Sequence, residues 1–186
     1  MIKMHLKELK NHWETIRAEL DALPMDVFIS DKLRPVDEWE GSDTLNEIIS
    51  KFSSGKHGWV HGTEHYKDTW ISWPFIWEDK QVLGNCIKCP KTWELLSQLE
   101  GIHVAGFSLM KGGVKIHEHS DILGKNYKLT YHLGIKCPDG CYLHHQTLGD
   151  VEEKDGKHIV MDARFPHWAD NTSQEDRVIL YIEYYT

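Results

Sequence analysis

Short runs in which apolar and polar residues alternate fill the second half of this 186-residue chain, separated by glycine, proline and aspartate. In an extended chain every second side chain points to the same face, so each run predicts a half-buried β-strand. Six such runs follow Ile102: VAGFSLM, VKIHEH, YKLTYHLGI, CYLHHQTL, KHIVMDA and DRVILYIEYY. Their spacing predicts an antiparallel double-sheet body, and we expect a mainly β fold of the jelly-roll type.

The residues before this body follow a helical pattern. Apolar side chains at three- and four-residue steps predict an amphipathic helix from Leu6 to Leu23, which Pro24 ends. Shorter helices are predicted over residues 42–52 and 90–99. Between them lies a stretch rich in glycine, histidine and tryptophan, which leads into a predicted strand, TWISWPFIW.

Length and charge narrow the class of protein. A chain of 186 residues suits one domain, residues 1–186, in which a helical and aromatic part (1–100) packs outside a jelly-roll core (101–186). The formal charge of -8 argues against a nucleic-acid or anionic-membrane surface, either of which needs clustered lysine and arginine. The N-terminus has no apolar signal region, and nowhere do 18 apolar residues run together, so we expect a soluble, cytoplasmic protein.

The four cysteines form two close pairs, Cys86 with Cys89 and Cys137 with Cys141. Two such pairs are compatible with a zinc site built from four thiolates, or with disulfides in an exported protein. The 48-residue step from Cys89 to Cys137 is much longer than the ~15–20 residues of the common zinc pattern. Reduced thiols in a cytosolic protein are therefore the favoured interpretation.

The segment His117-Glu118-His119-Ser120-Asp121 is the motif that points most clearly to chemistry. His119 and Asp121 are two residues apart, so a strand directs both side chains to one face. With a distant histidine, for which His167 is the candidate, they would form the facial triad of two histidines and one carboxylate that holds non-haem Fe(II). His117 shares that face and competes with His119 as the ligand. The alternative is a surface turn that Asp121 caps.

Arg177 adds a second element to this hypothesis. It follows His167 by ten residues and opens the last predicted strand. A strand-turn-strand path brings its guanidinium back toward the metal, where a planar fork suits a carboxylate such as the distal end of 2-oxoglutarate. The alternative is an arginine on an edge strand, paired at the surface with Asp176 or Glu183.

At this level of detail the chain resembles the aspartyl/asparaginyl β-hydroxylase family of 2-oxoglutarate oxygenases. The similar stretches span nearly the whole chain: NHWETIRAEL, NCIKCPKTWELL, FSLMKGGVKIHEHSD, YKLTYHLGI and MDARFPHWADNTSQEDRVILYIEY. The last three are the most specific, because their internal spacings match as well as their residues. The resemblance implies a double-stranded β-helix, another name for the jelly-roll, and it implies no zinc at NCIKCP.

The resemblance also implies roles for single residues. His119 and His167 match the two metal-binding histidines, and Arg177 and Ser108 match residues that hold the distal carboxylate of 2-oxoglutarate. His132 matches a histidine near the metal-side carboxylate. Thr130 departs from the pattern, since the family often has arginine there; Lys128, on the same face of that strand, is the candidate to supply the positive charge.

The expected function is that of a dioxygenase that uses Fe(II), 2-oxoglutarate and O₂ to hydroxylate an unactivated C–H bond of a small molecule or an amino-acid side chain. Asp121 stands where similar animal proteins have glycine, and a carboxylate ligand there favours hydroxylation over halogenation. Substrate selection is expected from the stretch Trp59 to Trp77, from residues 122–127 and from Trp168. The competing hypotheses are a non-catalytic jelly-roll that binds a ligand or partner protein, and a structural zinc protein built on the cysteines.

Overall fold

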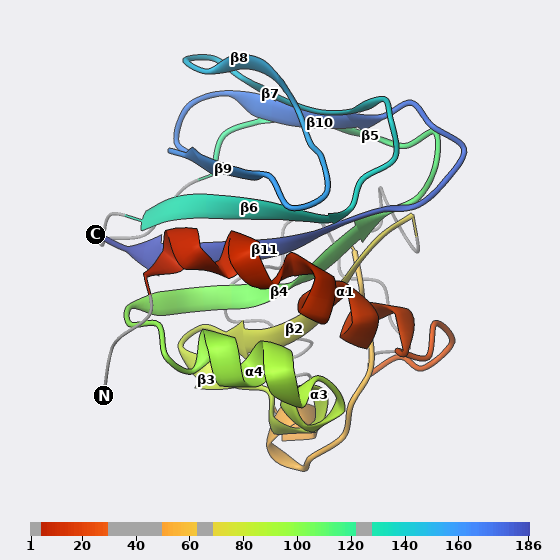
Figure 1. The fold of residues 1–186 in the computed structure, drawn as a ribbon, viewed down its shortest axis with the longest axis vertical. Helices are drawn as coiled ribbons and strands as arrows, with labels where there is room; N and C mark the ends of the chain where they lie inside the picture. Colours follow the sequence, from red (N-terminus) through yellow and green to blue (C-terminus); the bar gives the residue numbers. More distant parts are fainter. Residues whose placement is uncertain (1–4, 30–49, 63–68, 122–127) are drawn as a thin grey trace.

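The structure is a computed structural model that describes residues 5–29, 50–62, 69–121 and 128–186. Its strands form two antiparallel sheets. The large sheet has seven strands in the order β1-β2-β4-β11-β6-β9, with β3 paired to β2, and the small sheet has the order β5-β10-β7-β8. Figure 1 shows the small sheet stacked on one side of the large sheet and the helices gathered on the other. The predicted mainly β, jelly-roll architecture is confirmed.

The elements have the following bounds. The large sheet contains β1 (Val60–His61), β2 (Trp70–Trp77), β3 (Lys80–Gln81), β4 (Ile102–Met110), β6 (Lys128–Lys136), β9 (His158–Met161) and β11 (Arg177–Tyr185). The small sheet contains β5 (Lys115–His119), β7 (Cys141–His145), β8 (Gly149–Glu152) and β10 (His167–Asn171). The helices are η1 (Leu6–His12), α1 (Trp13–Asp21), α3 (Leu83–Lys88) and α4 (Pro90–Leu96).

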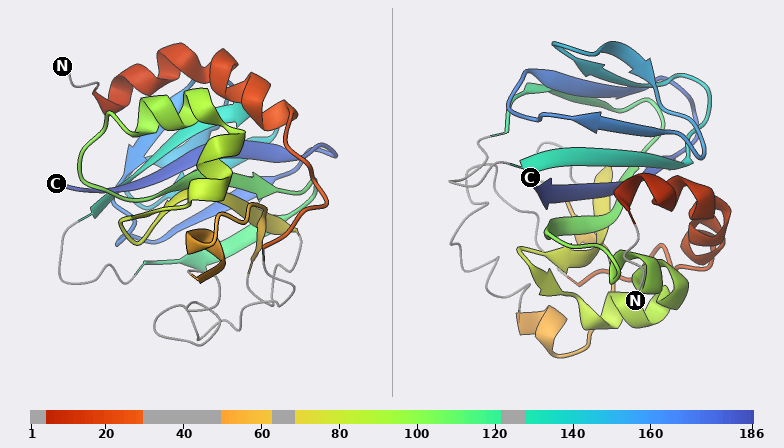
Figure 2. Two further views of the ribbon diagram at one scale, coloured as in Figure 1. Left: turned by 90° about the horizontal axis from the view of Figure 1, so that it is seen from below. Right: turned by 60° about the vertical axis from the view of Figure 1, so that its left-hand side comes forward.

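The helices cover the outer face of the large sheet, and the right-hand view in Figure 2 shows them on the opposite side of that sheet from the small sheet. Their buried residues, among them Leu9, Ile16 and Leu20, pack in one cluster with Phe107 and Leu180 of the sheet. Burying a side chain of this kind removes enough apolar area from water to contribute roughly 1.5–3 kcal/mol. This face is therefore the main core of the protein.

The predicted helix from Leu6 to Leu23 forms in two pieces. Residues 6–12 are a 3-10 helix, and the α-helix begins at Trp13 because His12 leaves helical geometry, with φ -115° and ψ 9°. The α-helix ends at Asp21, where the backbone N–H of Ala22 bonds to the carbonyl of Glu19 and that of Leu23 bonds to the carbonyl of Leu20.

Two other predictions for the first 100 residues are confirmed with shorter bounds. TWISWPFIW forms β2, and the helix predicted over 90–99 forms α4, which has Pro90 in its first turn and ends at Leu96. Because β2 pairs with β4, this part of the chain contributes to the large sheet as well as covering it. Of the helix predicted over 42–52, residues 42–49 lie outside the described residues, and residues 50–53 are helical.

The four cysteines are free thiols. Cys86 and Cys89 lie in the core under the helices, and Cys137 and Cys141 flank the turn between β6 and β7. Burial raises the pKa of Cys86 and of Cys141 to about 11, and it raises the pKa of Cys89 and Cys137 further. These raised pKa values favour the protonated thiols near neutral pH. In the part of the chain that the structure describes, the cysteines do not belong to the group of side chains close enough together to hold an ion.

Within the described ranges, no helix combines the length and the apolar character needed to cross a bilayer.

Candidate metal centre

The small sheet brings together three side chains with metal-binding atoms. β5 and β10 are antiparallel neighbours in which His119 lies directly opposite His167. Asp121 follows β5 and is held there by a hydrogen bond from its backbone N–H to the carbonyl of Ala163, 2.9 Å long. One ligand atom from each of His119, Asp121 and His167 lies within 4.8 Å of the other two. In the described part of the chain this is the only group of three with such spacing, and His117 is not in it.

Backbone carbonyls fix the orientation of both histidines. Nδ1 of His119 donates to the carbonyl of His117 at 2.7 Å, and Nδ1 of His167 donates to the carbonyl of Phe165 at 2.9 Å. Since the carbonyl oxygens can only accept, each proton sits on Nδ1 and each Nε2 keeps its lone pair. Nε2 of His119 is 3.8 Å from Oδ1 of Asp121. Two imidazole nitrogens and one carboxylate oxygen are thus presented to one place, with the outer hydrogen bonds that metal-binding histidines normally have.

Burial shifts the protonation of these groups. It raises the pKa of Asp121, an effect that His167 and His119 oppose. It lowers the pKa of His167, an effect that the Phe165 carbonyl opposes. A neutral imidazole is the form that binds a metal. The cluster is open on one side, because the side chains of His119 and Asp121 are 39% and 32% exposed whereas His167 is buried.

The face of the large sheet that looks toward this cluster is unusually polar. Cross-strand partners share a face, and Tyr181 lies opposite His132 while Glu183 lies opposite Thr130. Arg177 and Ser108 lie on that same face, at the start of β11 and toward the end of β4. Most of these polar side chains are buried: Ser108, Thr130, His132 and Arg177 are each at most 8% exposed.

Two of the predicted cosubstrate residues, Arg177 and His132, are joined by a carboxylate that sequence reasoning missed. Nε and Nη2 of Arg177 donate to the two oxygens of Glu153, both at 2.6 Å. Nδ1 of His132 lies 3.1 Å from Oε1 of Glu153, and its Nε2 has no hydrogen-bond partner among the described residues. Burial alone would raise the pKa of Glu153, but Arg177 and the hydrogen bond from His132 lower it to about 2. Glu153 is therefore a buried anion.

Burial also lowers the pKa of His132, against the opposing effects of Glu153 and of Asp121. Because an ionised Glu153 can only accept, the proton of neutral His132 sits on Nδ1. Nε2 then carries a lone pair, and it can donate a hydrogen bond only when the imidazole holds both protons. Asp121 and His167 lie near enough to His132 for their charges to affect one another's pKa.

The remaining predicted residues differ in what they contact. Ser108 Oγ accepts a hydrogen bond from Nε1 of Trp70 at 2.9 Å, so its own proton is available to a ligand. Thr130 is 1% exposed and neighbours Tyr181. Lys128 is the first residue of β6, and its side chain lies outside the described part.

The regions expected to select substrate are only partly at the site. Trp59 and Trp73 are fully buried in the core under the helices, on the face of the sheet that is turned away from the metal cluster. In the described part of this stretch, Trp70 is the residue that contacts a candidate cosubstrate-binding residue, Ser108. Trp168 also faces away, because strand alternation turns it opposite to His167 and stacks it on His144 at 4.9 Å. Residues 122–127 lie outside the described residues.

Comparison with known proteins identifies the family. The sequence model of the aspartyl/asparaginyl beta-hydroxylase family matches residues 10–186, and the chain belongs to this family. Aspartate beta-hydroxylase domain-containing protein 2 from Mus musculus is 32% identical over 136 residues, which are 68% of this chain and 37% of the mouse protein. The ornithine lipid ester-linked acyl 2-hydroxylase of Rhizobium tropici is 26% identical over 126 residues, 61% of this chain and 43% of that protein. The chain thus matches less than half the length of each relative.

Solved structures with a similar fold are more distant. An oxidoreductase of the 2OG-Fe(II) oxygenase family from Burkholderia pseudomallei aligns with a TM-score of 0.46 and 14% identity, over 63% of this chain and 68% of that one. A crystal structure of DMSP lyases aligns with a TM-score of 0.48 and 10% identity, over 96% of this chain and 93% of that one. These similarities concern the fold alone.

Proposed function

We propose that this protein is an iron(II)- and 2-oxoglutarate-dependent oxygenase that hydroxylates an unactivated C–H bond of a small molecule or an amino-acid side chain. The observation that carries the proposal is the convergence of His119, Asp121 and His167, with the Nε2 atoms of both histidines held free by their backbone hydrogen bonds. Membership in a family described as a β-hydroxylase supports it.

The chemistry of the donor set fits a divalent iron ion. Two imidazole nitrogens and one carboxylate on the same side of a metal leave the opposite positions open for a chelating cosubstrate and O₂. The lowered pKa of His167 keeps its imidazole neutral, as a ligand must be. The raised pKa of Asp121 belongs to the metal-free cluster, and a positive ion nearby favours the ionised carboxylate.

The polar face of the large sheet fits the two carboxylates of 2-oxoglutarate. Ser108 has a hydroxyl proton to donate, and Nη1 of Arg177 makes no hydrogen bond to any described residue, so these two groups would hold the distal carboxylate. The unpaired Nε2 of His132 would receive the metal-side carboxylate. It donates there as the doubly protonated imidazole, a form that nearby negative charge favours.

When bound, iron, 2-oxoglutarate and O₂ together supply the oxidation of C–H to C–OH, with release of succinate and CO₂. The protein supplies geometry around that chemistry. The triad would hold the metal on one face, and Ser108 and Arg177 would anchor the cosubstrate. A substrate approaches from the exposed side, where His119 and Asp121 are open and His167 is covered.

Two features bear on the reaction and the substrate. Asp121 would supply a carboxylate ligand at the position that a halide would need, so hydroxylation is the expected outcome. The Rhizobium tropici relative is named for hydroxylating the acyl chain of a lipid, and the family is described by aspartyl and asparaginyl groups. We propose an amino-acid side chain or another small molecule as the substrate here.

The test is aerobic turnover of 2-oxoglutarate by the iron-loaded protein, measured as succinate released, alone and with pools of metabolites or peptides. The proposal expects Fe(II)-dependent succinate that a substrate stimulates, and loss of that activity in Asp121→Ala. Asp150→Asn is the matched control, because this carboxylate is 72% exposed on the same small sheet. Succinate at the level of free iron in both the parent and Asp121→Ala would leave a non-catalytic binding domain as the better account.

A further inference from the structure

Glu153 is a buried carboxylate that contacts two groups of the proposed cosubstrate site at once. It is 3% exposed and lies directly after β8, where its backbone N–H bonds to the carbonyl of Cys141. We infer that Glu153 is a positioning residue, which orients Arg177 and His132 so that Nη1 of Arg177 and Nε2 of His132 face a dicarboxylate cosubstrate. This inference rests on the function proposed above.

The contact with Arg177 leaves one end of the guanidinium available. Glu153 takes the side formed by Nε and Nη2, a bidentate arrangement that fixes the plane of the group as well as its position. Nη1 lies at the other end and makes no hydrogen bond to any described residue. A second carboxylate can therefore bind end-on, in a direction that Glu153 has set in advance.

The contact with His132 selects which nitrogen is turned toward the site. Glu153 is ionised and accepts from Nδ1, so the ring can rotate little and the tautomer is fixed. The other nitrogen, Nε2, is buried without a partner in the described part of the chain. A buried polar atom without a partner is costly, and such atoms in native proteins commonly face a ligand or ion that completes them.

Glu153 has a second, opposite effect, because its negative charge reduces the net attraction of Arg177 for an anion. Positioning is expected to dominate for a structural reason. Arg177 is 2% exposed, so without Glu153 its charge would be buried and unpaired. The side chain or its surroundings would then rearrange, and the end-on geometry would be lost. An arginine at the surface would behave differently, since water would solvate it in place.

The test compares binding by metal-loaded protein without turnover. Fe(II) binding and then 2-oxoglutarate binding are titrated anaerobically for the parent, Glu153→Gln and Glu153→Asp. Glu153 offers two acceptor oxygens to three N–H groups, Nε and Nη2 of Arg177 and Nδ1 of His132, whereas a glutamine side chain offers one. Glu153→Gln should therefore weaken the binding of 2-oxoglutarate about 10- to 100-fold, as loss of an outer hydrogen-bond partner commonly does. Glu153→Asp keeps the charge and should lose less. Fe(II) affinity should stay close to that of the parent in both variants, because Glu153 contacts none of the three proposed metal ligands.

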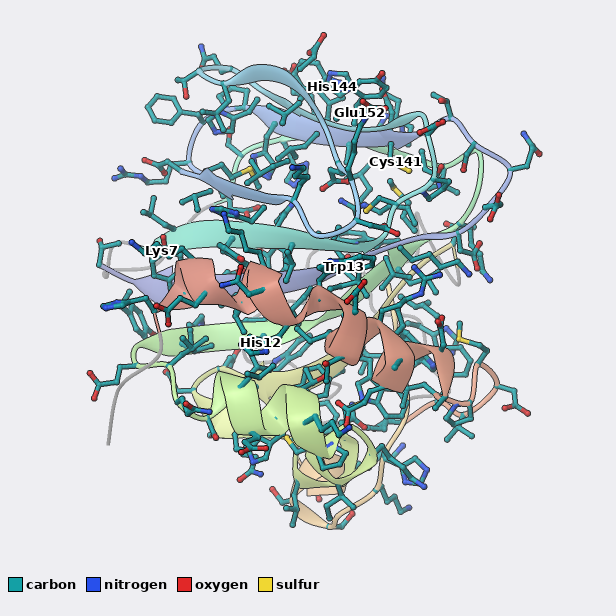
Figure 3. All side chains as sticks on the ribbon, in the orientation of Figure 1. Lys7, His12, Trp13, Cys141, His144 and Glu152 are labelled. Carbon is teal, nitrogen blue, oxygen red and sulfur yellow. The ribbon has the colours of Figure 1, made fainter. Side chains whose placement is uncertain are left out.

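Glu152→Gln is the matched control. Glu152 is the neighbouring residue on β8, its side chain is 29% exposed, and it pairs with Lys154. Figure 3 labels it on the small sheet, the layer farthest from the helices. This variant should bind both Fe(II) and 2-oxoglutarate like the parent.

A selectivity measurement separates positioning from general support of the fold. 2-Oxovalerate has the same chelating group but lacks the distal carboxylate that Arg177 would hold. The ratio of the affinities for 2-oxoglutarate and 2-oxovalerate should fall in Glu153→Gln. A purely structural loss would weaken the binding of both acids equally. If Glu153→Gln also loses Fe(II) binding, the affinities of Glu153→Asp for 2-oxoglutarate and 2-oxovalerate are compared instead.

Different results overturn different statements. If the parent and the Glu153 variants bind 2-oxoglutarate equally, or the variants bind it more tightly, Glu153 does not position the site, while the proposed function stands. If the parent binds Fe(II) but no 2-oxoglutarate, the proposed function fails and the inference about Glu153 fails with it.

Discussion

The two faces of the large sheet differ in what they bury. On β4, Phe107 points to the helices and joins the apolar core, whereas the next residue, Ser108, points to the small sheet and meets Trp70. On β11 the same alternation separates Leu180 from Arg177. Apolar burial stabilises a fold without further conditions, but buried polar groups cost free energy unless each finds a partner.

The inner face meets that condition almost completely. Arg177 and Glu153 satisfy each other, and Glu153 also accepts from Nδ1 of His132. Among the described residues of this face, Nε2 of His132 is buried without a hydrogen-bond partner, and Nη1 of Arg177 makes no hydrogen bond. The face toward the helices therefore supplies most of the stability. The face toward the small sheet carries polar groups that leave hydrogen-bonding atoms available to a ligand. Substitutions of neighbouring residues on the same strand can separate these two roles.

The largest loss of stability is expected from a substitution on the apolar face of the large sheet. Phe107 is fully buried and packs edge-on against Phe75, with ring centroids 5.1 Å apart. Phe107→Ala should lower the free energy of unfolding by about 3–5 kcal/mol through lost burial and the cavity left behind. Urea denaturation measures this. Fe(II) affinity of the folded fraction should remain close to that of the parent, and a large loss of it would show that the two faces are not separable.

The next effect concerns the buried pair on the polar face and its dependence on pH. The pKa of Glu153 is lowered from its ordinary 4.5 to about 2 in the folded protein, chiefly by Arg177 acting against burial. A lowered carboxyl pKa stabilises the fold above the unfolded pKa, so about 3 kcal/mol is present near neutral pH and is lost as pH falls from 4.5 toward 2.

Glu153→Gln isolates this contribution. The difference in unfolding free energy between the parent and Glu153→Gln should be largest at neutral pH and should shrink at low pH. A difference that stays constant between pH 7 and pH 3 would contradict an ionised, Arg177-paired Glu153.

A smaller effect is expected from Ser108, the neighbour of Phe107 that faces the site. Ser108→Ala removes one hydroxyl donor and should weaken the binding of 2-oxoglutarate roughly tenfold, which corresponds to about 1.4 kcal/mol of binding free energy. Unfolding free energy should fall by no more than about 1 kcal/mol, since the main loss is the acceptor for Trp70. If Ser108→Ala lowered stability as much as Phe107→Ala, the two faces of β4 would not differ in role.

The smallest effect is expected at the cysteines. All four are free and burial raises their pKa values, so a chelator should leave the unfolding midpoint unchanged in a variant with both His119 and His167 replaced. Thiol counting after denaturation should find four reduced groups. One zinc per chain that survives substitution of both His119 and His167 would contradict this.

The features that sequence predicted share a short-range cause. The alternation in β4, β6 and β11 reflects two different environments on either side of each strand, so the pattern could be recognised without knowing the partners. His119 and Asp121 were recognisable for a similar reason, because two residues along a strand return to one face.

The features that were missed depend on distant residues. Glu153 sits in the charged run GDVEEKDGK, which is typical of an exposed turn, and it is buried because Arg177 lies 24 positions further along the chain. β10 spans five residues, His167–Asn171, and becomes a strand by pairing with β5 and β7 on either side. The break at His12 is likewise invisible in the apolar spacing that predicted one continuous helix.

The most direct test of the central claim is an anaerobic titration with Fe(II) and then 2-oxoglutarate, following the visible charge-transfer absorption of the chelate. The parent should bind one of each per chain. Asp121→Ala should lose Fe(II) first, and Arg177→Ala should keep most Fe(II) binding but lose a hundredfold or more in 2-oxoglutarate affinity, since one side of a buried charged pair is worth about 3–5 kcal/mol. An absorption band that is equally strong in the parent and in both variants would contradict the account, because the chelate would then form elsewhere.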